Sequence, residues 1–360
     1  MFAVLKLVNL IYIPLAILAH LLVETYLVKP LSLPVTILLF TDALMVFAFA
    51  MRLSKRKIHQ APILRPLIQF SLLCFSFFSF YIPCLIILAI ADLFFEISSN
   101  MGLLAFAVSI GMTLYQAWAV QTPVLRQIQI PLPSRFQSLK GLSFVHISDL
   151  HLGPFLGAGF VEHLVQQIAN TPAEFVCLTG DLMDGPYNAY KDCIEPLKKL
   201  TAIKTVYFVT GNHEYYYDAN LWIQELQSMG VTVLRSETKF YSWNNSQLAI
   251  AGIDDSLFKN PQEAEFREQL STLKAPCLLL SHRPETWDIY KNIPVALQLS
   301  GHGHGGQAFP WAFIIRKVMK YPFGLFQDND SSLYVHSGTG FWGPPNRWLN
   351  PPEVCRIELV

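Results

Sequence analysis

The sequence predicts a membrane anchor of four helices followed by an α/β domain, and three observations support this fold class. Hydrophobic residues make up 52% of the 360 residues, and the longest apolar runs all lie within residues 1–120. Residues 121–360 instead hold short apolar runs of strand length, with helical patterns between the early ones. Polar residues of the kinds that bind metals directly follow several of these short runs. We therefore place a domain boundary near residue 120.

The anchor is predicted from four apolar runs, at residues 4–28, 34–53, 67–90 and 101–120. The hydrocarbon core of a bilayer is about 30 Å thick and needs about 20 helical residues to span it, so each run is long enough. A cleaved signal peptide is not expected, because its apolar core has only about 7–15 residues and three more runs follow here. The lipid bilayer is thus the first predicted partner of the chain.

The orientation of the anchor follows from the basic residues between the second and third runs. These are Arg52, Lys55, Arg56, Lys57 and Arg65. Short loops rich in lysine and arginine stay on the cytoplasmic side, so we expect this loop and both chain ends there. His20 and Glu24 share a helix face because they are four residues apart. With Asp42, they predict a structural polar contact between the first two helices rather than a functional site.

Charge and cysteine content exclude some partners. The formal charge is zero, from 26 Lys and Arg against 26 Asp and Glu. A nucleic-acid partner is not expected, because it would need a clustered basic face. The cysteines follow no disulfide or metal-ligand spacing, so we expect them to be small buried apolar side chains.

Continuous apolar runs predict the strands of the second domain. They are residues 142–147, 175–179, 205–210, 248–253, 277–281, 295–300, 333–337 and 354–359. Such runs suit strands that are buried on both faces. Helical patterns at 159–170, 190–200 and 219–229 separate the early strands, whereas the later strands have fewer helices between them, so we expect a mixed sheet. Prolines from Pro123 to Pro133 mark a linker or an edge strand, because proline donates no ladder hydrogen bond.

Five short stretches after strand-like runs carry residues that bind metals. They are Asp149-Leu150-His151, Gly180-Asp181, Gly211-Asn212-His213-Glu214, Ser281-His282 and Gly301-His302-Gly303-His304. Taken singly, each also suits an ordinary turn. Together they predict one metal site, because the strand ends of an α/β domain can lie along one edge of its sheets.

In this motif order, residues 121–360 resemble a calcineurin-like metallophosphoesterase. The stretches Ser148–Gly153, Gly301–Gln307 and Ser337–Gly340 are similar to a membrane-associated bacterial branch of phosphodiesterases, which includes pyrophosphatases acting on UDP-2,3-diacylglucosamine. The resemblance implies two mixed β-sheets flanked by helices, an αββα sandwich, and a place in the bacterial inner membrane. One departure is Gly303, where the branch usually has threonine, which puts the rigidity of that loop in question rather than metal binding.

The resemblance also implies a role for each residue of the site. Three residues would bind a first divalent ion: Asp149, His151 and His304. Three would bind a second: Asn212, His282 and His302. Asp181 would bridge both ions, and His213 would approach the phosphate without binding metal.

Elementary chemistry favours the same arrangement. Two divalent ions about 3.5–4 Å apart can activate water and hold phosphoryl oxygens, and a carboxylate such as Asp181 can serve both because it has two oxygens. His213 can then protonate the leaving oxygen. Asp184 either orients His213 by accepting its ring proton or caps a turn before Gly185. Mixed nitrogen and oxygen ligands suit Mn, which we favour, or Fe or Zn, and argue against Ca.

Two arginines and one segment are candidates for substrate binding. Arg283 and Arg347 could contact phosphate, because a forked guanidinium fits that group; the alternative is that both are solvated loop residues. The segment from Phe309 to Phe326 interleaves apolar and basic residues, which suits a membrane interface or a groove for acyl chains. It equally suits an element that closes the domain's own core.

These patterns predict a membrane-anchored phosphohydrolase with two metal ions, which cleaves a phosphodiester or pyrophosphate at the membrane surface. On the resemblance, the favoured substrate is a lipid-linked nucleotide such as UDP-2,3-diacylglucosamine, and the favoured process is lipid A biosynthesis. The alternatives are a broad-specificity phosphodiesterase for soluble nucleotides and a non-catalytic scaffold that binds metal structurally. The complete ligand set and His213 argue against the scaffold.

Overall fold

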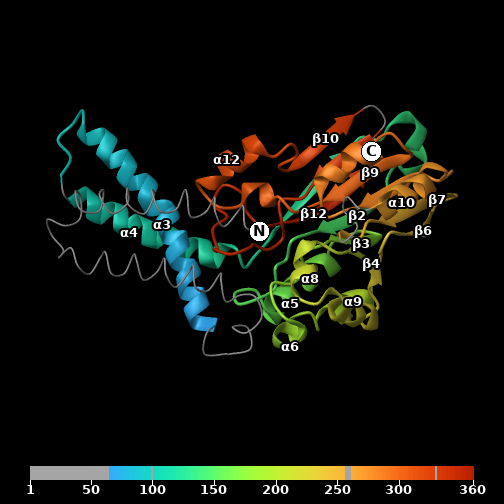
Figure 1. The fold of residues 1–360 in the computed structure, drawn as a ribbon, viewed down its shortest axis with the longest axis horizontal. Coiled ribbons are helices and arrows are strands. Elements are labelled where there is room, and N and C mark those ends of the chain that lie inside the picture. Colours follow the sequence, from blue (N-terminus) through green and yellow to red (C-terminus); the bar gives the residue numbers. More distant parts are fainter. Residues whose placement is uncertain (1–64, 99, 256–260, 329–330) are drawn as a thin grey trace.

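The computed structural model describes residues 65–98, 100–255, 261–328 and 331–360. A hairpin of two long helices stands beside a domain that contains two β-sheets (Figure 1). The second helix of the hairpin leads into the first strand of the domain after a short connection. The hairpin and the domain are therefore continuous in space as well as in sequence.

The hairpin consists of α3 (Arg65–Asp92) and α4 (Asn100–Ala119), which match the third and fourth predicted spans. Both are long and apolar enough to cross a membrane. Their interface is aromatic, since the ring of Phe106 lies 5.3 Å from that of Phe77 and 5.8 Å from that of Tyr81, measured between centroids. Two of the predicted spans are thus present as candidate membrane helices.

Residues 1–64 lie outside the described part of the chain. The predicted spans at 4–28 and 34–53, with His20, Glu24 and Asp42, fall in this region. So does the predicted basic loop except for its last residue. The structure therefore tests the third and fourth predicted spans and leaves the first two as predictions.

The first sheet has the strand order β1-β12-β2-β3-β4-β5. Its strands are β1 (Val124–Ile130), β2 (Ser143–Ile147), β3 (Phe175–Thr179), β4 (Thr205–Val209), β5 (Thr232–Val233) and β12 (Glu353–Leu359). Strands β2 to β5 are parallel, whereas β12 is antiparallel to β2 and parallel to β1. The sheet is mixed, as predicted, and β1 is an edge strand between Pro123 and Pro131.

The second sheet has the strand order β10-β11-β9-β8-β7-β6. Its strands are β6 (Glu237–Trp243), β7 (Ser246–Gly252), β8 (Cys277–Leu280), β9 (Val295–Ser300), β10 (Gly324–Asp328) and β11 (Ser331–Val335). The four central strands are parallel, and the edge strands β6 and β10 are antiparallel to their neighbours. This sheet is mixed as well.

Helices of the domain lie mainly between the early strands. They are α5 (Ala158–Ala169), α6 (Tyr187–Tyr190), α7 (Leu197–Thr201), α8 (Asn212–Tyr216), α9 (Ala219–Ser228), α10 (Pro261–Ser271), α11 (Trp287–Tyr290) and α12 (Trp311–Val318). The helices predicted at 159–170 and 219–229 are confirmed as α5 and α9. The prediction of one helix over 190–200 is wrong, because α6, a 3₁₀ turn and α7 replace it. Pro196 explains the break, since proline lacks an N–H and clashes inside a helix.

The two sheets pack face to face, and helices cover their outer faces. Phe144 and Phe175 of the first sheet share one buried cluster with Ile250 and Leu280 of the second. Side chains of α5 and α9 pack on the outer face of the first sheet, and those of α10 and α11 pack on the outer face of the second. The layers are therefore helix, sheet, sheet and helix, as the resemblance implied.

Candidate metal centre

Five strands end in the residues that the motifs singled out. Strand β2 leads to Asp149, β3 to Asp181, β4 to Asn212, β8 to His282 and β9 to His302. Because the two sheets lie face to face, these carboxyl ends meet at one edge. The structure therefore brings the five motifs together, as predicted.

Asp149, His151 and His304 form the first group of candidate ligands. The Nε2 atoms of the two rings lie 2.9 Å apart, and Asp149 Oδ1 lies 3.3 Å from His304 Nε2 and 3.8 Å from His151 Nε2. All three residues are buried. His151 donates its Nδ1–H to Asp184 at 2.9 Å, which leaves its Nε2 facing the other two residues. Two imidazole nitrogens and a carboxylate oxygen at one point fit one divalent ion.

Asp181, His282 and His302 form the second group. His282 Nε2 lies 3.2 Å from Asp181 Oδ2 and 3.1 Å from His302 Nδ1. The other ring nitrogen of His282 donates to the carbonyl oxygen of Thr179 at 2.8 Å, so its Nε2 remains available for metal. Asn212 gives an independent indication, because its buried Oδ1 has no hydrogen-bond donor among the described residues. A buried unpaired oxygen is costly, and a cation would satisfy it.

Asp181 lies between the two groups. Its Oδ2 is 3.2 Å from His282 Nε2 in its own group and 3.8 Å from His151 Nε2 in the other. Its Oδ1 accepts the backbone N–H of His213 at 2.8 Å, which fixes the carboxylate. This is the position that a bridging carboxylate needs.

The backbone of five candidate ligands is left-handed. These are Asp149 (φ 54°), His151 (φ 48°), Asp181 (φ 52°), His302 (φ 73°) and His304 (φ 49°). Such angles are uncommon for residues other than glycine and cost on the order of 1–3 kcal/mol each. They tighten the turns that follow β2, β3 and β9, so that side chains from these three turns lie close together. The surrounding structure must hold these turns in place.

Glycine is required at two turns beside the ligands. A Cβ atom at Gly211 or at Gly301 would overlap the carboxylate of a candidate ligand. At Gly303, where the related branch usually has threonine, a Cβ atom would come within 2.9 Å of Met319 Cε. Packing of Met319 therefore takes up the space that a larger residue would fill.

Burial and charge set the protonation states of the histidines. Burial lowers the pKa of His302 to about 3 and holds the pKa of His304 well below its usual value, so both rings are neutral. Burial also acts to lower the pKa of His282, but the Asp181 carboxylate outweighs it and raises that pKa to about 10. A cation that binds here would take the place of the proton on His282.

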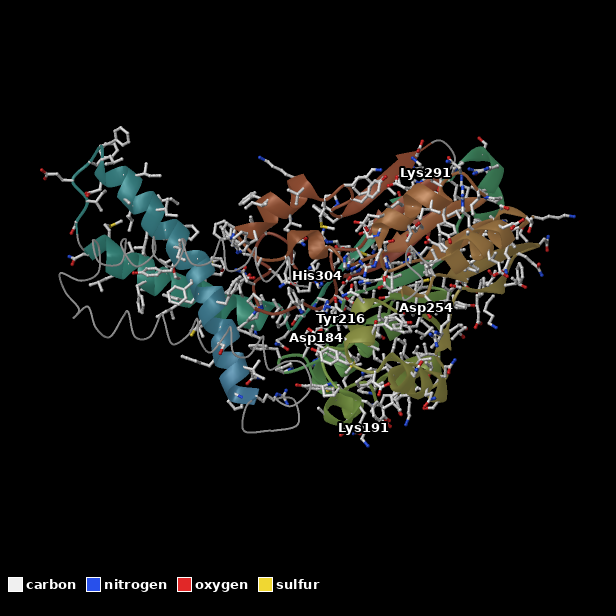
Figure 2. All side chains as sticks on the ribbon, in the orientation of Figure 1. Asp184, Lys191, Tyr216, Asp254, Lys291 and His304 are labelled. Carbon is white, nitrogen blue, oxygen red and sulfur yellow. The ribbon has the colours of Figure 1, made fainter. Side chains whose placement is uncertain are left out.

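His213 lies beside the bridging carboxylate and outside both ligand groups. Its Nε2 is 3.8 Å from Asp181 Oδ2, and its Nδ1 is 2.5 Å from Asp184 Oδ1. Burial would lower the pKa of His213, but the two carboxylates raise it, so the ring holds a proton at the site. Asp184 accepts from both His213 and His151, which favours the orienting role over the turn cap. Figure 2 shows Asp184 in the middle of the domain, near Tyr216 and His304.

Glu214 supports the site, although its motif suggested no role for it. Its buried carboxylate accepts three backbone N–H groups, from Leu182 at 2.7 Å, Asp181 at 3.0 Å and Gly211 at 2.7 Å. Burial, helped by the nearby Asp181, raises its pKa to about 7. The side chain thus joins the turn after β3 to the turn after β4. Its position three residues after Gly211, at the start of α8, is a capping signal that could have revealed it.

Replacement of Glu214 with alanine is expected to lower the free energy of unfolding by roughly 3 kcal/mol or more, because each buried N–H left unpaired costs about 1–3 kcal/mol. Chemical denaturation of the full chain would measure the loss. Glu195→Ala is the matched control, since its side chain is largely exposed and should change stability by less than about 0.5 kcal/mol. Equal stability of the two variants would contradict the supporting role.

The two candidate arginines have different surroundings in the structure. Arg283 donates to both carboxylate oxygens of Asp255, at 2.7 and 3.0 Å, and its side chain is partly exposed, so a phosphate contact stays a prediction. Arg347 is only 1% exposed, and it donates to the carbonyl oxygens of Ser337 and Asn350. The predicted phosphate contact of Arg347 therefore also stays a prediction, whereas its burial excludes the alternative of a solvated loop residue. The loop after β11 folds back against α4, and this contact buries it.

Comparisons with known proteins agree with this geometry. The family model for calcineurin-like phosphoesterases matches residues 142–306. The chain belongs to this metallophosphoesterase family.

Relatives come from animals and bacteria. A zebrafish (Danio rerio) transmembrane protein with a metallophosphoesterase domain is 31% identical over 67% of this chain and 58% of its own length. A Campylobacter jejuni metallophosphoesterase is 31% identical over 67% of this chain and 64% of its own length. One from Aquifex aeolicus is 32% identical over 61% of this chain and 85% of its own length. The chain thus spans about three fifths of the length of the first two relatives.

Proposed function

We propose that this chain is a membrane-anchored phosphohydrolase that uses two divalent metal ions to cleave a phosphodiester or pyrophosphate bond. The observation that carries the proposal is the convergence of two ligand groups on either side of Asp181, with His213 beside them. Metal ions bound there would activate water and draw charge from phosphoryl oxygens. Mn²⁺ is the favoured ion, with Fe and Zn as alternatives that suit the same ligands.

His213 is the proposed general acid. Its raised pKa keeps a proton on the ring, and its Nε2 faces the side of Asp181 where a phosphate would lie. Proton transfer to a leaving oxygen contributes typically 10²–10⁴-fold to a rate. Asp184 holds the other ring nitrogen, which keeps the ring in the orientation that this transfer needs.

Helix α12 supports a membrane-facing role for the catalytic edge. Its inner side packs on the metal-binding loop, since Ala312 is fully buried and Arg316 donates to the carbonyl oxygen of Gly305 at 3.0 Å. Its outer side exposes Phe313 and Val318. The helix therefore closes the domain and also presents apolar side chains, which suits contact with a lipid surface.

Two exposed aromatic side chains flank His213 and support a substrate with a large apolar or ring-bearing group. The Trp342 ring lies 6.0 Å from the His213 ring, and the Tyr216 ring lies 4.9 Å from it, measured between centroids. The side chain of Gln307 makes two hydrogen bonds with the backbone of Trp342. It accepts the N–H at 2.9 Å and donates to the carbonyl oxygen at 2.7 Å. A lipid-linked nucleotide such as UDP-2,3-diacylglucosamine is the substrate we favour, as a step in lipid A biosynthesis.

Incubation of the purified full chain with this lipid nucleotide and Mn²⁺, followed by identification of the products by mass, tests the proposal. We expect UMP and the lipid monophosphate. Hydrolysis of a chromogenic phosphodiester without turnover of the lipid nucleotide would favour the broad phosphodiesterase. Failure on both substrates with metal bound would favour the scaffold.

Replacement of Trp342 with alanine is expected to lower kcat/KM for the lipid nucleotide about tenfold, because an aromatic contact contributes roughly 0.5–1.5 kcal/mol beyond its buried area. The rate for a small chromogenic phosphodiester should stay within about twofold. Trp118→Ala is the matched control, since Trp118 is an exposed tryptophan on α4. If both variants lose the same activity toward the lipid nucleotide, Trp342 has no specific role.

The proposed location is the bacterial inner membrane, with the catalytic domain on the cytoplasmic side. Support comes from the basic loop between the predicted second and third spans and from the candidate membrane helices α3 and α4. A reporter fused after Val360 should be active in the cytoplasm. Activity confined to the outer side would reverse the orientation.

A further inference from the structure

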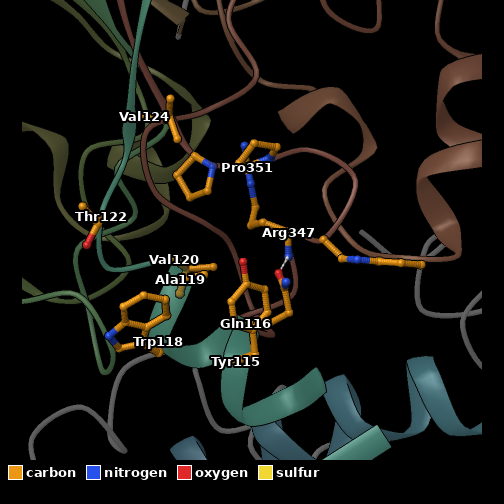
Figure 3. A pocket seen from close by; sticks show the side chains of 11 residues that line it. Tyr115, Gln116, Trp118, Ala119, Val120, Thr122, Val124, Arg347 and Pro351 are labelled. Carbon is orange, nitrogen blue, oxygen red and sulfur yellow. Dashed lines mark hydrogen bonds between the residues drawn. The ribbon is translucent and has the colours of Figure 1, made fainter. Parts of the chain in front are cut away.

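We propose that the anchor hairpin positions the candidate metal ligand His304 through Gln116 and Arg347. This inference rests on the metal centre of the proposed function. Gln116 lies in the last turn of α4, and its Oε1 accepts the backbone N–H of Arg347 at 3.0 Å. Both residues are buried. Figure 3 shows this hydrogen bond at the junction of the anchor and the domain.

The loop that Gln116 holds contacts His304 on two sides. The guanidinium of Arg347 lies 3.3 Å from His304 Nδ1, the ring nitrogen opposite the one that faces Asp149. Asn350 donates its side-chain N–H to the carbonyl oxygen of His304. Arg347 and Asn350 are also joined to each other, because Arg347 Nε donates to the Asn350 carbonyl oxygen at 2.8 Å. One loop therefore contacts the ring of His304 through Arg347 and fixes its backbone through the hydrogen bond from Asn350.

Helix α3 contacts the same loop at the residues directly before and after Arg347. Asn346 donates to the hydroxyl oxygen of Ser79 at 2.5 Å. The ring of Phe80 lies 5.8 Å from that of Phe309 and 6.0 Å from that of Trp348, measured between centroids. Both helices of the hairpin are thus attached to the segment that supports His304.

His304 needs such support for two reasons. Its left-handed backbone (φ 49°) is strained, and it persists only where surrounding contacts fix it. Residues that hold a metal ligand from outside typically change metal affinity 10–100-fold when they are altered. A cavity of about 430 Å³ lies beside Gln116 and Arg347, lined also by Tyr115, Trp118 and Pro351. Beside this cavity, the hydrogen bond that Gln116 accepts from the backbone N–H of Arg347 joins α4 to the loop.

The test is a titration of the metal-free full chain, in detergent micelles, with Mn²⁺ whose free concentration is followed by electron paramagnetic resonance. In Gln116→Ala, which removes the acceptor, we expect one of the two ions to bind about tenfold more weakly. Gln116→Glu keeps an acceptor oxygen in either protonation state and should bind as the parent does. Thr113→Val is the matched control, because Thr113 is buried on the same helix and, within the described residues, donates to the carbonyl oxygen of Ser109, at 2.8 Å.

Each other result overturns the inference. If Gln116→Ala binds both ions as tightly as the parent, the anchor does not position His304. If Thr113→Val weakens binding equally, or if Gln116→Glu is as weak as the alanine variant, the effect comes from general damage to the hairpin. If the parent binds no Mn²⁺, the proposed metal centre fails, and this inference fails with it.

Discussion

Replacement of Asp181 with asparagine is expected to remove one of the two metal ions and to lower kcat by about 10³-fold, or roughly 4 kcal/mol. Asparagine has nearly the same shape, so packing around the site should be kept. Its amide is neutral, however, so its oxygen would bind two cations more weakly than the charged Oδ2 of Asp181, which faces both groups. In the structure the Asp181 carboxylate is close to both ligand groups, at 3.2 Å from His282 and 3.8 Å from His151.

The measurement is the metal content of the purified variant together with its rate on a chromogenic phosphodiester. Asp192→Asn is the matched control, because Asp192 is an exposed carboxylate in the turn after α6. It should keep two ions and full activity. An Asp181→Asn protein with two ions per chain and the parental rate would rule out the bridging role.

His213→Ala is expected to keep both metal ions and to lose about 10²–10⁴-fold in kcat, the usual contribution of a general acid. The side chain belongs to neither ligand group, so its removal should spare metal binding. Its Nε2 lies 3.8 Å from the bridging carboxylate and its Nδ1 is held 2.5 Å from Asp184, so its loss removes the proposed proton donor.

His163→Ala controls for the loss of a histidine elsewhere, since His163 is exposed on α5. Metal content and rate are measured as for the first variant. Turnover at the parental rate would show that His213 transfers no proton in the rate-limiting step. Loss of metal would show instead that it is a ligand.

The ligand positions could be predicted from the sequence because two simple rules act together. Continuous apolar runs such as 175–179 and 295–300 form strands that are buried on both faces, and parallel strands end at a common edge. A polar residue placed directly after such a run, such as Asp181 or His302, must then lie at that edge. These rules do not predict the order of the strands in the sheet. Strand β12, at the far end of the chain, pairs with β2, and no local pattern indicates that pairing.

Other features depend on tertiary contacts that no local pattern records. Arg347 follows a Gly-Pro-Pro stretch typical of an exposed loop, but the hydrogen bond to Gln116 and the packing of α4 bury it. The capping position of Glu214 after Gly211 is a local signal, but its hydrogen bond from the Leu182 N–H, on a different turn, is a tertiary contact. The helix predicted at 190–200 is interrupted for a local reason, because Pro196 cannot continue a helix through its position.

The most direct measurement is the number of Mn²⁺ ions bound per full chain at saturation, determined from metal and protein content after removal of free metal. The two ligand groups on either side of Asp181 predict two ions per chain, and His304→Ala should reduce the number to one. A saturated value of one or none in the unaltered protein would contradict the two-metal site.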